Sequence, residues 1–432
     1  MDEAGSAMDD LLQLQQPLKE GGIRSVNFFN GRLLAGKDLS REQTARREAD
    51  WRLGLALGQG VAFGLQVEFD AQLSKATLPV ARVKAGLAFN RRGQALRLTD
   101  NAHVALARRF ETASANRLFS NCTVLGGGTY VAGAGAYLLT IAPAEMSEGR
   151  APTNGLDPAN VRCNTDATVE AVQFRLLWVN PSAYLGLDVA APSFRNELAY
   201  RCFGVGVQPS WFENLLGAAV RQDDLLEALR KTVLSDLDVP LALLVFTGAA
   251  DVRFIDLWAV RRPLARADAN GALASLLDTR RLAVGQAMFL QFQEQIAGLA
   301  PPAGDLGGVT ARSHFRYLPP AGVIPVAEET DATDAAATKF FKDMTYRGPA
   351  FINAARLEGL LRESLCYPPI DTQDAEMVWL YRVRENRKAI DFAGGAARPR
   401  SYLVFASGHL PYRGDAQFDL ASWNYGNFAL AR

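Results

Sequence analysis

The residues best suited to catalysis are the three histidines of the chain, His103, His314 and His409. None has a glutamate or histidine three or four residues further on, so none belongs to a helical pair of metal ligands. The sequence also contains no G-x-S-x-G run, which would place a serine nucleophile on a strand-to-helix turn. We therefore predict ordinary surface or turn histidines and no catalytic residues.

The four cysteines are widely separated and form no C-x-x-C pair, so the sequence predicts no metal site. Cys202 stands beside Phe203 in an apolar segment and is predicted to be a buried thiol. Cys122 and Cys163 flank a loop-rich region, and a disulfide between them is one alternative. Because no signal sequence is apparent, we expect both to be reduced. The fourth, Cys366, stands alone in the C-terminal part.

A glycine cluster, Gly126–Gly128 with Gly133 and Gly135, invites comparison with a phosphate-binding loop. Such a loop needs a lysine followed by serine or threonine, and the sequence has neither there. A dinucleotide loop would lead into a helix, whereas Ala136–Ile141 has the pattern of a strand. The cluster is therefore interpreted as a hairpin or loop, and no cofactor is expected.

Acidic pairs such as Asp223-Asp224 and Glu328-Glu329 lie in polar stretches. Nothing in the sequence places two carboxylates across a cleft, as a glycosidase would require. Trp178, Trp258 and Trp379 fall within predicted strands, and core packing explains them better than a sugar-binding platform.

These residues belong to a chain of 432 residues with 46 basic and 46 acidic side chains, and therefore with no formal net charge. Proteins that bind nucleic acid usually carry a basic excess, so no nucleic-acid partner is expected. The chain is 49% hydrophobic but has no apolar run long enough to span a membrane. Its first twenty residues are polar and acidic, which predicts no signal peptide and a cytoplasmic location.

The periodicity predicts a β-rich α+β fold with several small antiparallel sheets or barrel-like modules linked by helices. We expect five segments: a flexible arm at 1–22, a helix with a β module at 23–110, a second β-rich domain at 111–263, a helical segment and Gly/Pro linker at 264–304, and an α+β domain at 305–432.

In the first module a charged helix is expected over Glu42–Leu57, capped by Asp38 or Ser40. Its charge predicts that it is solvated or lies against a polar partner. Strands are expected over Val61–Val67, Thr77–Val83 and Gln94–Leu98, with a turn at residues 90–93.

In the second domain, strands are expected over Tyr137–Ile141 and Val169–Val179. The polar stretch Glu145–Asn164 between them is interpreted as a long loop and interaction surface. The other expected elements are a helix over Asp223–Leu237, strands over Leu241–Phe246, Phe254–Arg261, Met377–Arg384 and Ser401–Ala406, helical sequence over 264–300, and a short helix over Asn353–Ser364.

Four stretches of the sequence, in this order along the chain, are similar to stretches of a known group of proteins. They are Asn27–Leu34 with Asp38-Leu39 and Glu42-Gln43; Gly60-Val61 and Gly64–Val67 with Val83–Ala88 and Arg92-Gly93; Pro240–Ala242 with Phe254–Trp258 and Arg261-Arg262; and Phe315–Gly322 with Pro325-Val326. In this order they resemble proteins encoded with phage-tail-like contractile injection systems, near baseplate and fibre components. Ala85 departs from the group, which usually has proline there. The resemblance spans residues 23 to 326.

The resemblance implies a non-enzymatic structural subunit at the baseplate periphery, at a fibre attachment or in a cage. The partners would be baseplate, sheath or fibre proteins, with a homo-oligomer of this chain in the assembly. From the residues themselves, the candidate interaction residues are Phe28, Phe29, Arg32, Leu33, Leu34, Trp211, Phe212, Trp423 and Tyr425. The N-terminal group either covers an edge of the first sheet or docks on a neighbouring subunit.

Two other interpretations stay open. One is a module for host-surface or carbohydrate recognition, which would use residues 145–164 or the aromatic residues at 423–425. The weaker one is a hydrolase or toxin-like cargo, for which the three histidines would be the obvious general bases.

Overall fold

The computed structural model describes residues 21–75, 78–109, 129–131, 133–152, 163–205, 225–248, 251–265, 279–299, 306, 308–325, 339–353, 357–365, 367–374, 376–384 and 402–407. The helices are α1 (Gly36–Leu57), η1 (Pro181–Tyr184), α2 (Phe194–Cys202), α4 (Leu225–Arg230), α6 (Thr279–Leu299), α7 (Ala311–His314) and α9 (Leu357–Ser364). The strands are β1 (Gly60–Gly64), β2 (Val67–Phe69), β3 (Val80–Val83), β4 (Gly86–Phe89), β5 (Ala95–Leu98), β6 (Ala102–Ala105), β7 (Ala107–Arg109), β8 (Thr129–Val131), β9 (Gly135–Pro152), β10 (Cys163–Val179), β11 (Val239–Phe246), β12 (Val252–Asp256), β13 (Tyr317–Leu318), β14 (Ala321–Pro325), β15 (Thr345–Asn353), β16 (Ile370–Asp371), β17 (Met377–Arg384) and β18 (Tyr402–Ser407).

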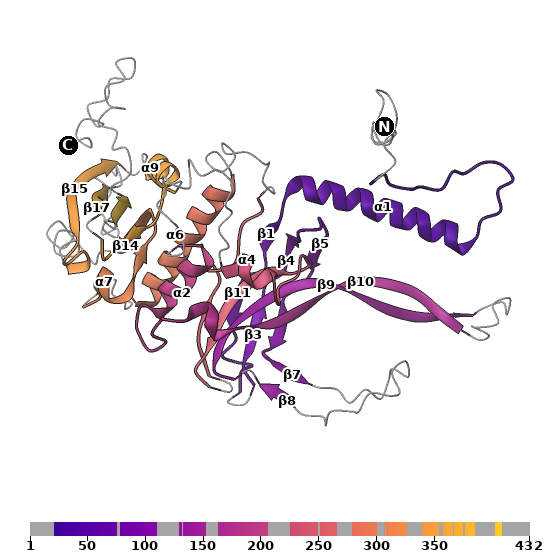
Figure 1. The fold of residues 1–432 in the computed structure, drawn as a ribbon, viewed down its shortest axis with the longest axis horizontal. Helices are drawn as coiled ribbons and strands as arrows, with labels where there is room; N and C mark the ends of the chain where they lie inside the picture. The colour runs from indigo at the N-terminus through magenta and orange to yellow at the C-terminus, as the bar shows by residue number, and fades with distance from the viewer. Residues whose placement is uncertain are drawn as a thin grey trace, which may run out of the picture.

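The predicted fold class is confirmed: the strands form several small, open sheets with helices between them (Figure 1). Among the named strands in the described residues, all pairings are antiparallel except that of β15 with β17, which is parallel. No helix in this part of the chain is long and apolar enough to cross a membrane.

The centre of the molecule is the antiparallel sheet β10-β9-β11-β12. Every residue of β11 is buried, because the sheet is covered on both faces. Leu138 and Leu243 pack in one core with residues of α2, α4 and α6. Their neighbours Leu139 and Leu244 point the other way, into a core shared with β1 to β5. The segments on either side of residue 110 therefore contribute to one hydrophobic core.

The small sheets β1-β4-β5 and β2-β3-β6 make the other wall of that core. The single strand expected over Val61–Val67 is wrong, because the chain bends at Leu65, whose φ is +57°. Leu65 is fully buried there, and its N–H donates to the carbonyl of Ala85 at 3.3 Å. The bend passes the chain from one small sheet to the other, between β1 and β2.

The turn predicted at residues 90–93 is confirmed and joins β4 to β5. The carboxamide oxygen of Asn90 accepts from the N–H groups of Arg92 and Gln94, both at 3.0 Å. Gly93 completes the turn with a φ of +79°, which glycine adopts without strain.

The C-terminal part is the sheet β14-β18-β17-β15, packed between two helices. On one face Phe292 of α6 packs against Phe405 and Phe315, with ring centroids 5.2 and 5.1 Å away. On the other face Leu360 and Leu361 of α9 cover the sheet. The strands predicted over Met377–Arg384 and Ser401–Ala406 are confirmed as β17 and β18.

Helix α6 connects the central and C-terminal sheets, since its residues belong to both cores. A buried polar contact fixes it to the central sheet: Asp256 accepts from Arg195 at 2.8 Å and from Gln291 of α6 at 3.0 Å. Arg195 also donates to Glu294 of α6 at 2.8 Å. Burial raises the pKa of Glu294, and the nearby Asp256 adds to this, while Arg195 opposes it.

Three further expectations are corrected. The strand expected to Arg261 ends at Asp256, because the Asp256 carboxylate accepts from the N–H of Ala259 and turns the chain. The helix expected over Asp223–Leu237 is α4, which is described only from Leu225 and ends at Arg230. Trp178 lies in a strand as predicted but is 49% exposed instead of lying in the core.

The largest correction concerns the loop expected over Glu145–Asn164. Residues up to Pro152 continue β9, and β10 begins at Cys163, so the two strands form one long antiparallel ribbon. The residues 153–162 between them lie outside the described ranges. The polar side chains misled the prediction, because the strands are held by their mutual backbone hydrogen bonds and have no buried face at this end.

Helix α1 meets the rest of the molecule through a close backbone contact. A Cβ placed on Gly54 would lie 2.0 Å from the carbonyl oxygen of Gly93, in the β4–β5 turn. The helix begins at Gly36, earlier than predicted, and neither Asp38 nor Ser40 is its N-cap, which is Ala35.

This contact predicts that Gly54→Ala destabilises the protein. In an open helix the same change stabilises by up to about 1 kcal/mol. Here the added methyl group cannot fit, and we expect a loss of about 1–3 kcal/mol in the free energy of unfolding, measured by urea denaturation. The exposed glycine Gly36 in the first turn of the same helix provides the control, because a Cβ there meets nothing within 4 Å. Equal effects of the two substitutions would contradict the contact.

Candidate functional site

Two arms extend from the same side of the molecule: helix α1 and the outer part of the β9–β10 ribbon (Figure 1). Beyond Ile141, β9 leaves β11, and in the described residues 142–152 pair with β10 alone. Residues 145–150 and 165–170 are all exposed. A two-stranded ribbon without further packing is only marginally stable in water, so this arm is suited to being covered by another surface.

Helix α1 is equally bare. Of its 22 residues only Ala45 and Gly54 are buried. Helices in proteins gain most of their stability from packing one face against a neighbour, and intrinsic propensity contributes less. A helix of this length with so little burial in its own chain offers its surface to a partner.

The segment 21–35, here called the strap, folds back along α1. At one end Arg52 donates to the carbonyl of Gly21, and in the middle the N–H of Val26 donates to Glu42 at 3.2 Å. The strap thereby supplies the helix with part of its missing packing, and Val26 and Ala45 become buried. Of the arm predicted at 1–22, residues 1–20 lie outside the described part of the chain.

The strap turns into the helix through a tight polar lock around Arg32. Its guanidinium contacts Asp38 at 2.6 Å and donates to the carbonyl of Asn27 at 2.7 Å. Asp38 also accepts from the N–H of Ala35 at 3.1 Å. That backbone hydrogen bond, followed by the one from Arg32, holds the pKa of Asp38 below its ordinary value.

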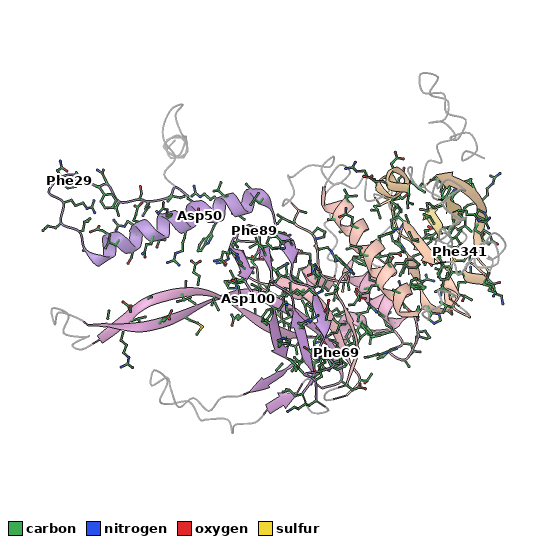
Figure 2. All side chains as sticks on the ribbon, turned by 180° about the vertical axis from the view of Figure 1, so that it is seen from behind. Phe29, Asp50, Phe69, Phe89, Asp100 and Phe341 are labelled. Carbon is green, nitrogen blue, oxygen red and sulfur yellow. The ribbon has the colours of Figure 1, made fainter. Side chains whose placement is uncertain are left out.

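The lock presents a group of apolar side chains at the free end of the arm, here called the tip patch. Its members are exposed by 53% to 93%: Phe28, Phe29, Leu33, Leu34 and Leu39. Figure 2 shows Phe29 at the far end of this arm. Four of the predicted interaction residues are thus exposed in this segment, and the fifth, Arg32, forms the lock between them. The other candidates, Trp211, Phe212, Trp423 and Tyr425, lie outside the described residues.

The two arms carry opposite charge. The exposed charged side chains of α1 are basic except for Asp50: Lys37, Arg41, Arg46, Arg47 and Arg52. The acidic Asp38 and Glu42 turn toward the strap, and Glu48 is also partly buried. The outer ribbon instead carries Glu145, Glu148, Asp166 and Glu170 against Arg150.

One contact joins these charges. Glu145 lies directly opposite Glu170 in the ribbon register, an arrangement in which like charges destabilise the strand pair. Arg47 of α1 reaches both carboxylates, at 3.3 and 4.0 Å. All three side chains are well exposed, so the contact orients the arms more than it stabilises them.

The described residues offer little for catalysis. His103 contacts Asp70 at 3.0 Å, and backbone N–H groups, chiefly that of Leu73, lower the pKa of Asp70. The nearby hydroxyl of Ser74 donates to the carbonyl of Val80 and accepts from its N–H group. His314 contacts Ser313 at 2.7 Å, and His409 lies outside the described ranges. Within those ranges no cluster of three His, Cys, Asp or Glu side chains could hold a metal. Cys202 is buried, as predicted.

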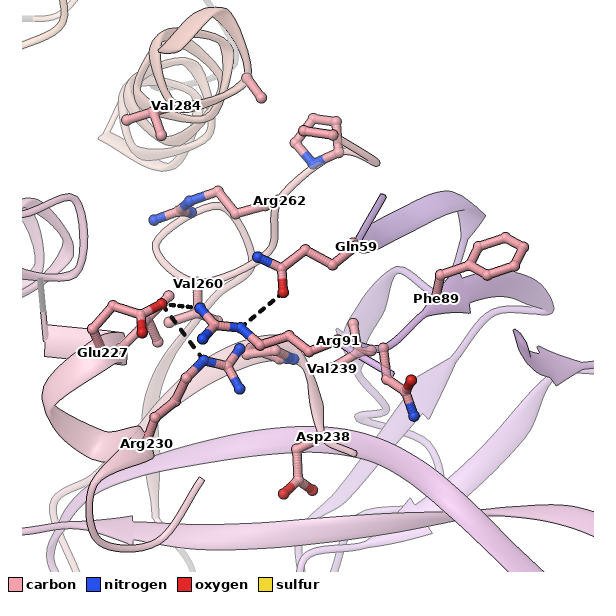
Figure 3. Close-up of a pocket in the computed structure, with 17 residues that line it drawn as sticks. Gln59, Phe89, Arg91, Glu227, Arg230, Asp238, Val239, Val260, Arg262 and Val284 are labelled. Atoms are coloured by element: carbon pink, nitrogen blue, oxygen red, sulfur yellow. Dashed lines mark hydrogen bonds and ion pairs between the residues drawn. The ribbon is translucent and has the colours of Figure 1, made fainter. Parts of the chain in front are cut away.

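A cavity of about 90 Å³ lies where the first β module meets α4 and α6 (Figure 3). Arg91, Arg230 and Arg262 line it, and each of the three makes contacts within the protein. Arg91 contacts Glu227 and donates to the carboxamide oxygen of Gln59 at 2.9 Å. Arg230 and Arg262 donate to backbone carbonyls. The contacts around the cavity thus join the first β module to α4 and to the start of β11; this region is called the junction below.

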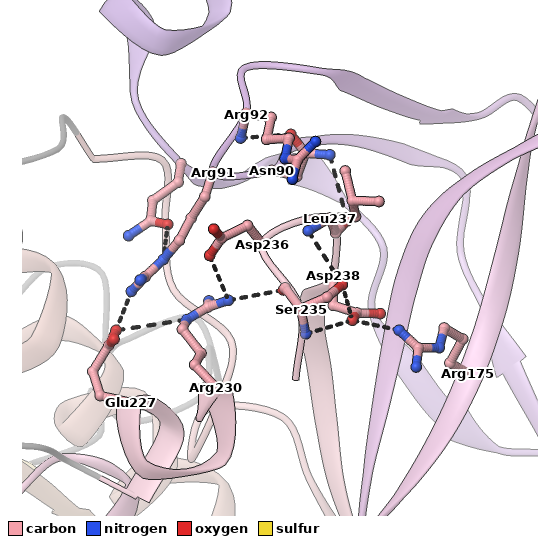
Figure 4. A network of polar contacts seen from close by, with 11 residues as sticks. Asn90, Arg91, Arg92, Arg175, Glu227, Arg230, Ser235, Asp236, Leu237 and Asp238 are labelled. Atoms are coloured by element: carbon pink, nitrogen blue, oxygen red, sulfur yellow. Dashed lines mark hydrogen bonds and ion pairs between the residues drawn. The ribbon is translucent and has the colours of Figure 1, made fainter. Parts of the chain in front are cut away.

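The lining of this cavity includes the buried carboxylate of Asp238, which accepts four hydrogen bonds (Figure 4). It accepts from Thr140 at 2.9 Å, from Arg175 at 2.5 Å, and from both the N–H and the hydroxyl of Ser235, at 2.9 and 2.6 Å. The turn so formed meets the β4–β5 turn: the carbonyl of Asp236 accepts from the N–H of Arg91 at 3.1 Å.

Comparison with known proteins adds no assignment: no protein-family model matches the chain, and a search of curated proteins finds no match.

Removal of the Asp238 carboxylate is predicted to destabilise the junction. Asp238→Ala leaves the buried hydroxyl of Thr140 without its acceptor and the half-buried Arg175 without its ion-pair partner, and we expect a loss of about 3 kcal/mol in the free energy of unfolding. The neighbouring Asp236→Ala removes an exposed carboxylate 4.0 Å from Arg230 and should cost less than about 0.5 kcal/mol. Similar losses in the two variants, measured by denaturant unfolding, would contradict the role of Asp238.

Protonation of Asp38 is predicted to loosen the tip of the first arm. Because its pKa is lowered in the folded protein, its stabilisation is complete above its ordinary pKa and is lost as the pH falls through the lowered value. Hydrogen exchange over residues 28–38, corrected for the intrinsic rate at each pH, should therefore rise on acidification below about pH 4. Asp38→Asn should show the faster exchange already at neutral pH, with no further rise from this group. Equal exchange in both proteins at neutral pH would contradict the lock.

Proposed function

We propose that this chain is a non-enzymatic structural subunit of a phage-tail-like contractile injection particle, placed at the baseplate periphery, at a fibre attachment or in a cage. The observation that carries the proposal is the pair of bare arms, α1 with its strap and the outer β9–β10 ribbon. Both are long, regular elements with little packing in their own chain, as expected of a subunit whose surfaces are completed by neighbours.

The sequence supports the particle assignment in a second way. The four stretches that resemble injection-system proteins occur in order, and the first of them, Asn27–Leu34 with Asp38-Leu39, coincides with the tip patch and its lock. Four residues of this first stretch, Phe28, Phe29, Leu33 and Leu34, are therefore exposed. This favours a role in binding a neighbour over a role in the hydrophobic core.

The direct test is purification of intact particles from cells that produce this chain with its own neighbouring genes. We expect mass spectrometry to find the chain in the same gradient fractions as sheath, tube and spike proteins. Assembled particles that lack it, with the chain left in the free-protein fractions, would contradict the proposal.

A variant with a shortened β9–β10 ribbon should still fold but should no longer assemble into particles efficiently. Residues 144–171 are replaced by Asn-Gly, which suits a two-residue hairpin turn between the directly paired Pro143 and Val172. All contacts of the central sheet are kept, so the melting temperature should change by no more than a few degrees. Incorporation into particles should fall at least about tenfold.

Leu185→Ser provides the matched control, since Leu185 is 77% exposed and lies on neither arm. This variant should enter particles like the unmodified protein. Normal incorporation of the shortened ribbon would remove that arm from the proposal.

A further inference from the structure

One face of α1 carries a regular stripe of exposed residues, here called the α1 stripe. Its members follow one another at spacings of four, three, four, three and four: Leu39, Gln43, Arg46, Asp50, Leu53 and Leu57. This is the spacing of the contact positions of a coiled coil. All six side chains are exposed, and the three leucines by 53%, 67% and 54% in chain order.

The other sides of the helix are already engaged. The strap lies over the side of Asp38, Glu42 and Ala45, Arg47 reaches the ribbon, and Gly54 meets the β4–β5 turn. With about 100° between successive residues, the α1 stripe lies between the strap side and the ribbon side. Figure 2 shows its central residue Asp50 on the part of α1 that projects from the body. The stripe is therefore open to a partner along its length.

The positions of the α1 stripe are symmetric about residue 48 along the helix. When a second α1 helix runs in the opposite direction, each position therefore faces another position of the same stripe. In an antiparallel pair of α1 helices, Arg46 of one helix lies opposite Asp50 of the other, and this occurs twice. In a parallel pair Arg46 would face Arg46 and Asp50 would face Asp50, with repulsion at both levels. The charges thus select the antiparallel orientation.

The apolar ends are complementary in the same orientation. Leu39 of one helix lies opposite Leu57 of the other, and the aliphatic stem of Gln43 lies opposite Leu53. Leu39 and Leu57 are about 27 Å apart along the helix, so both ends of the stripe are covered at once. Leu39 also belongs to the tip patch, which is thereby carried to the root of the partner helix, beside Leu57.

We propose that two copies of this chain pair through their α1 helices, antiparallel, about a two-fold axis at the level of residue 48 along each helix. A second copy is the occupant that the residues favour, because every position of the stripe finds its complement in the same stripe. The pairing does not rest on the proposed role in a particle, since it concerns the purified chain in solution.

The test measures the mass of the full-length protein by light scattering and sedimentation over a concentration series. The unmodified chain should form a dimer. Arg46→Asp places acidic residues opposite one another, and Asp50→Arg places basic residues opposite one another, so each should weaken the dimer at least about tenfold. The double variant Arg46→Asp/Asp50→Arg restores both contacts with reversed sign and should dimerise to within about threefold of the unmodified chain.

Mixing gives the sharper result. An Arg46→Asp chain and an Asp50→Arg chain complement each other at both central levels, so the mixture should form heterodimers although each variant alone is largely monomeric. Lys37→Asp, a charge reversal on the side of α1 away from the stripe, should leave the dimer unchanged. Circular dichroism checks that every variant is folded. An unmodified chain that stays monomeric, or a double variant and a mixture without rescue, would overturn the proposal.

Discussion

The arms of this protein depend on one buried carboxylate, that of Asp238. It fixes the turn at residues 235–238, whose carbonyl groups hold the β4–β5 turn through Arg91 and Asn90. The tip of that second turn is Gly93, which touches Gly54 at the root of α1. The direction in which the helix leaves the body is thus set by a chain of backbone contacts that begins in the core of the central sheet.

The two arms solve a shared physical problem in different ways. A lone helix lacks side-chain packing, and the strap supplies some of it through Arg32 and Val26. A lone ribbon lacks neighbouring strands, and its facing pair Glu145 and Glu170 adds repulsion that Arg47 relieves. Both solutions are partial, which leaves each arm with exposed surface to be covered on assembly.

Sequence reasoning was reliable where side chains determine the structure. The apolar runs Leu241–Phe246 and Met377–Arg384 are strands, and Asn90 with Gly93 makes the predicted turn. It failed where backbone pairing or long-range contacts decide. The polar ribbon beyond Glu145 has no buried face to create a pattern, and the bend at Leu65 depends on packing between two sheets. The tip patch was visible in the sequence, but the lock that exposes it needed the position of Asp38 relative to Arg32.

The balance of 46 basic and 46 acidic residues conceals how the charges are distributed. The exposed side of α1 is basic and the outer ribbon is acidic, so the chain is neutral as a whole and polarised at its arms. Neutrality limits repulsion between many copies packed together, whereas polarised arms orient each contact. Within α1 the same principle operates on a smaller scale, because a second helix that runs in the opposite direction places an Asp50 opposite each Arg46.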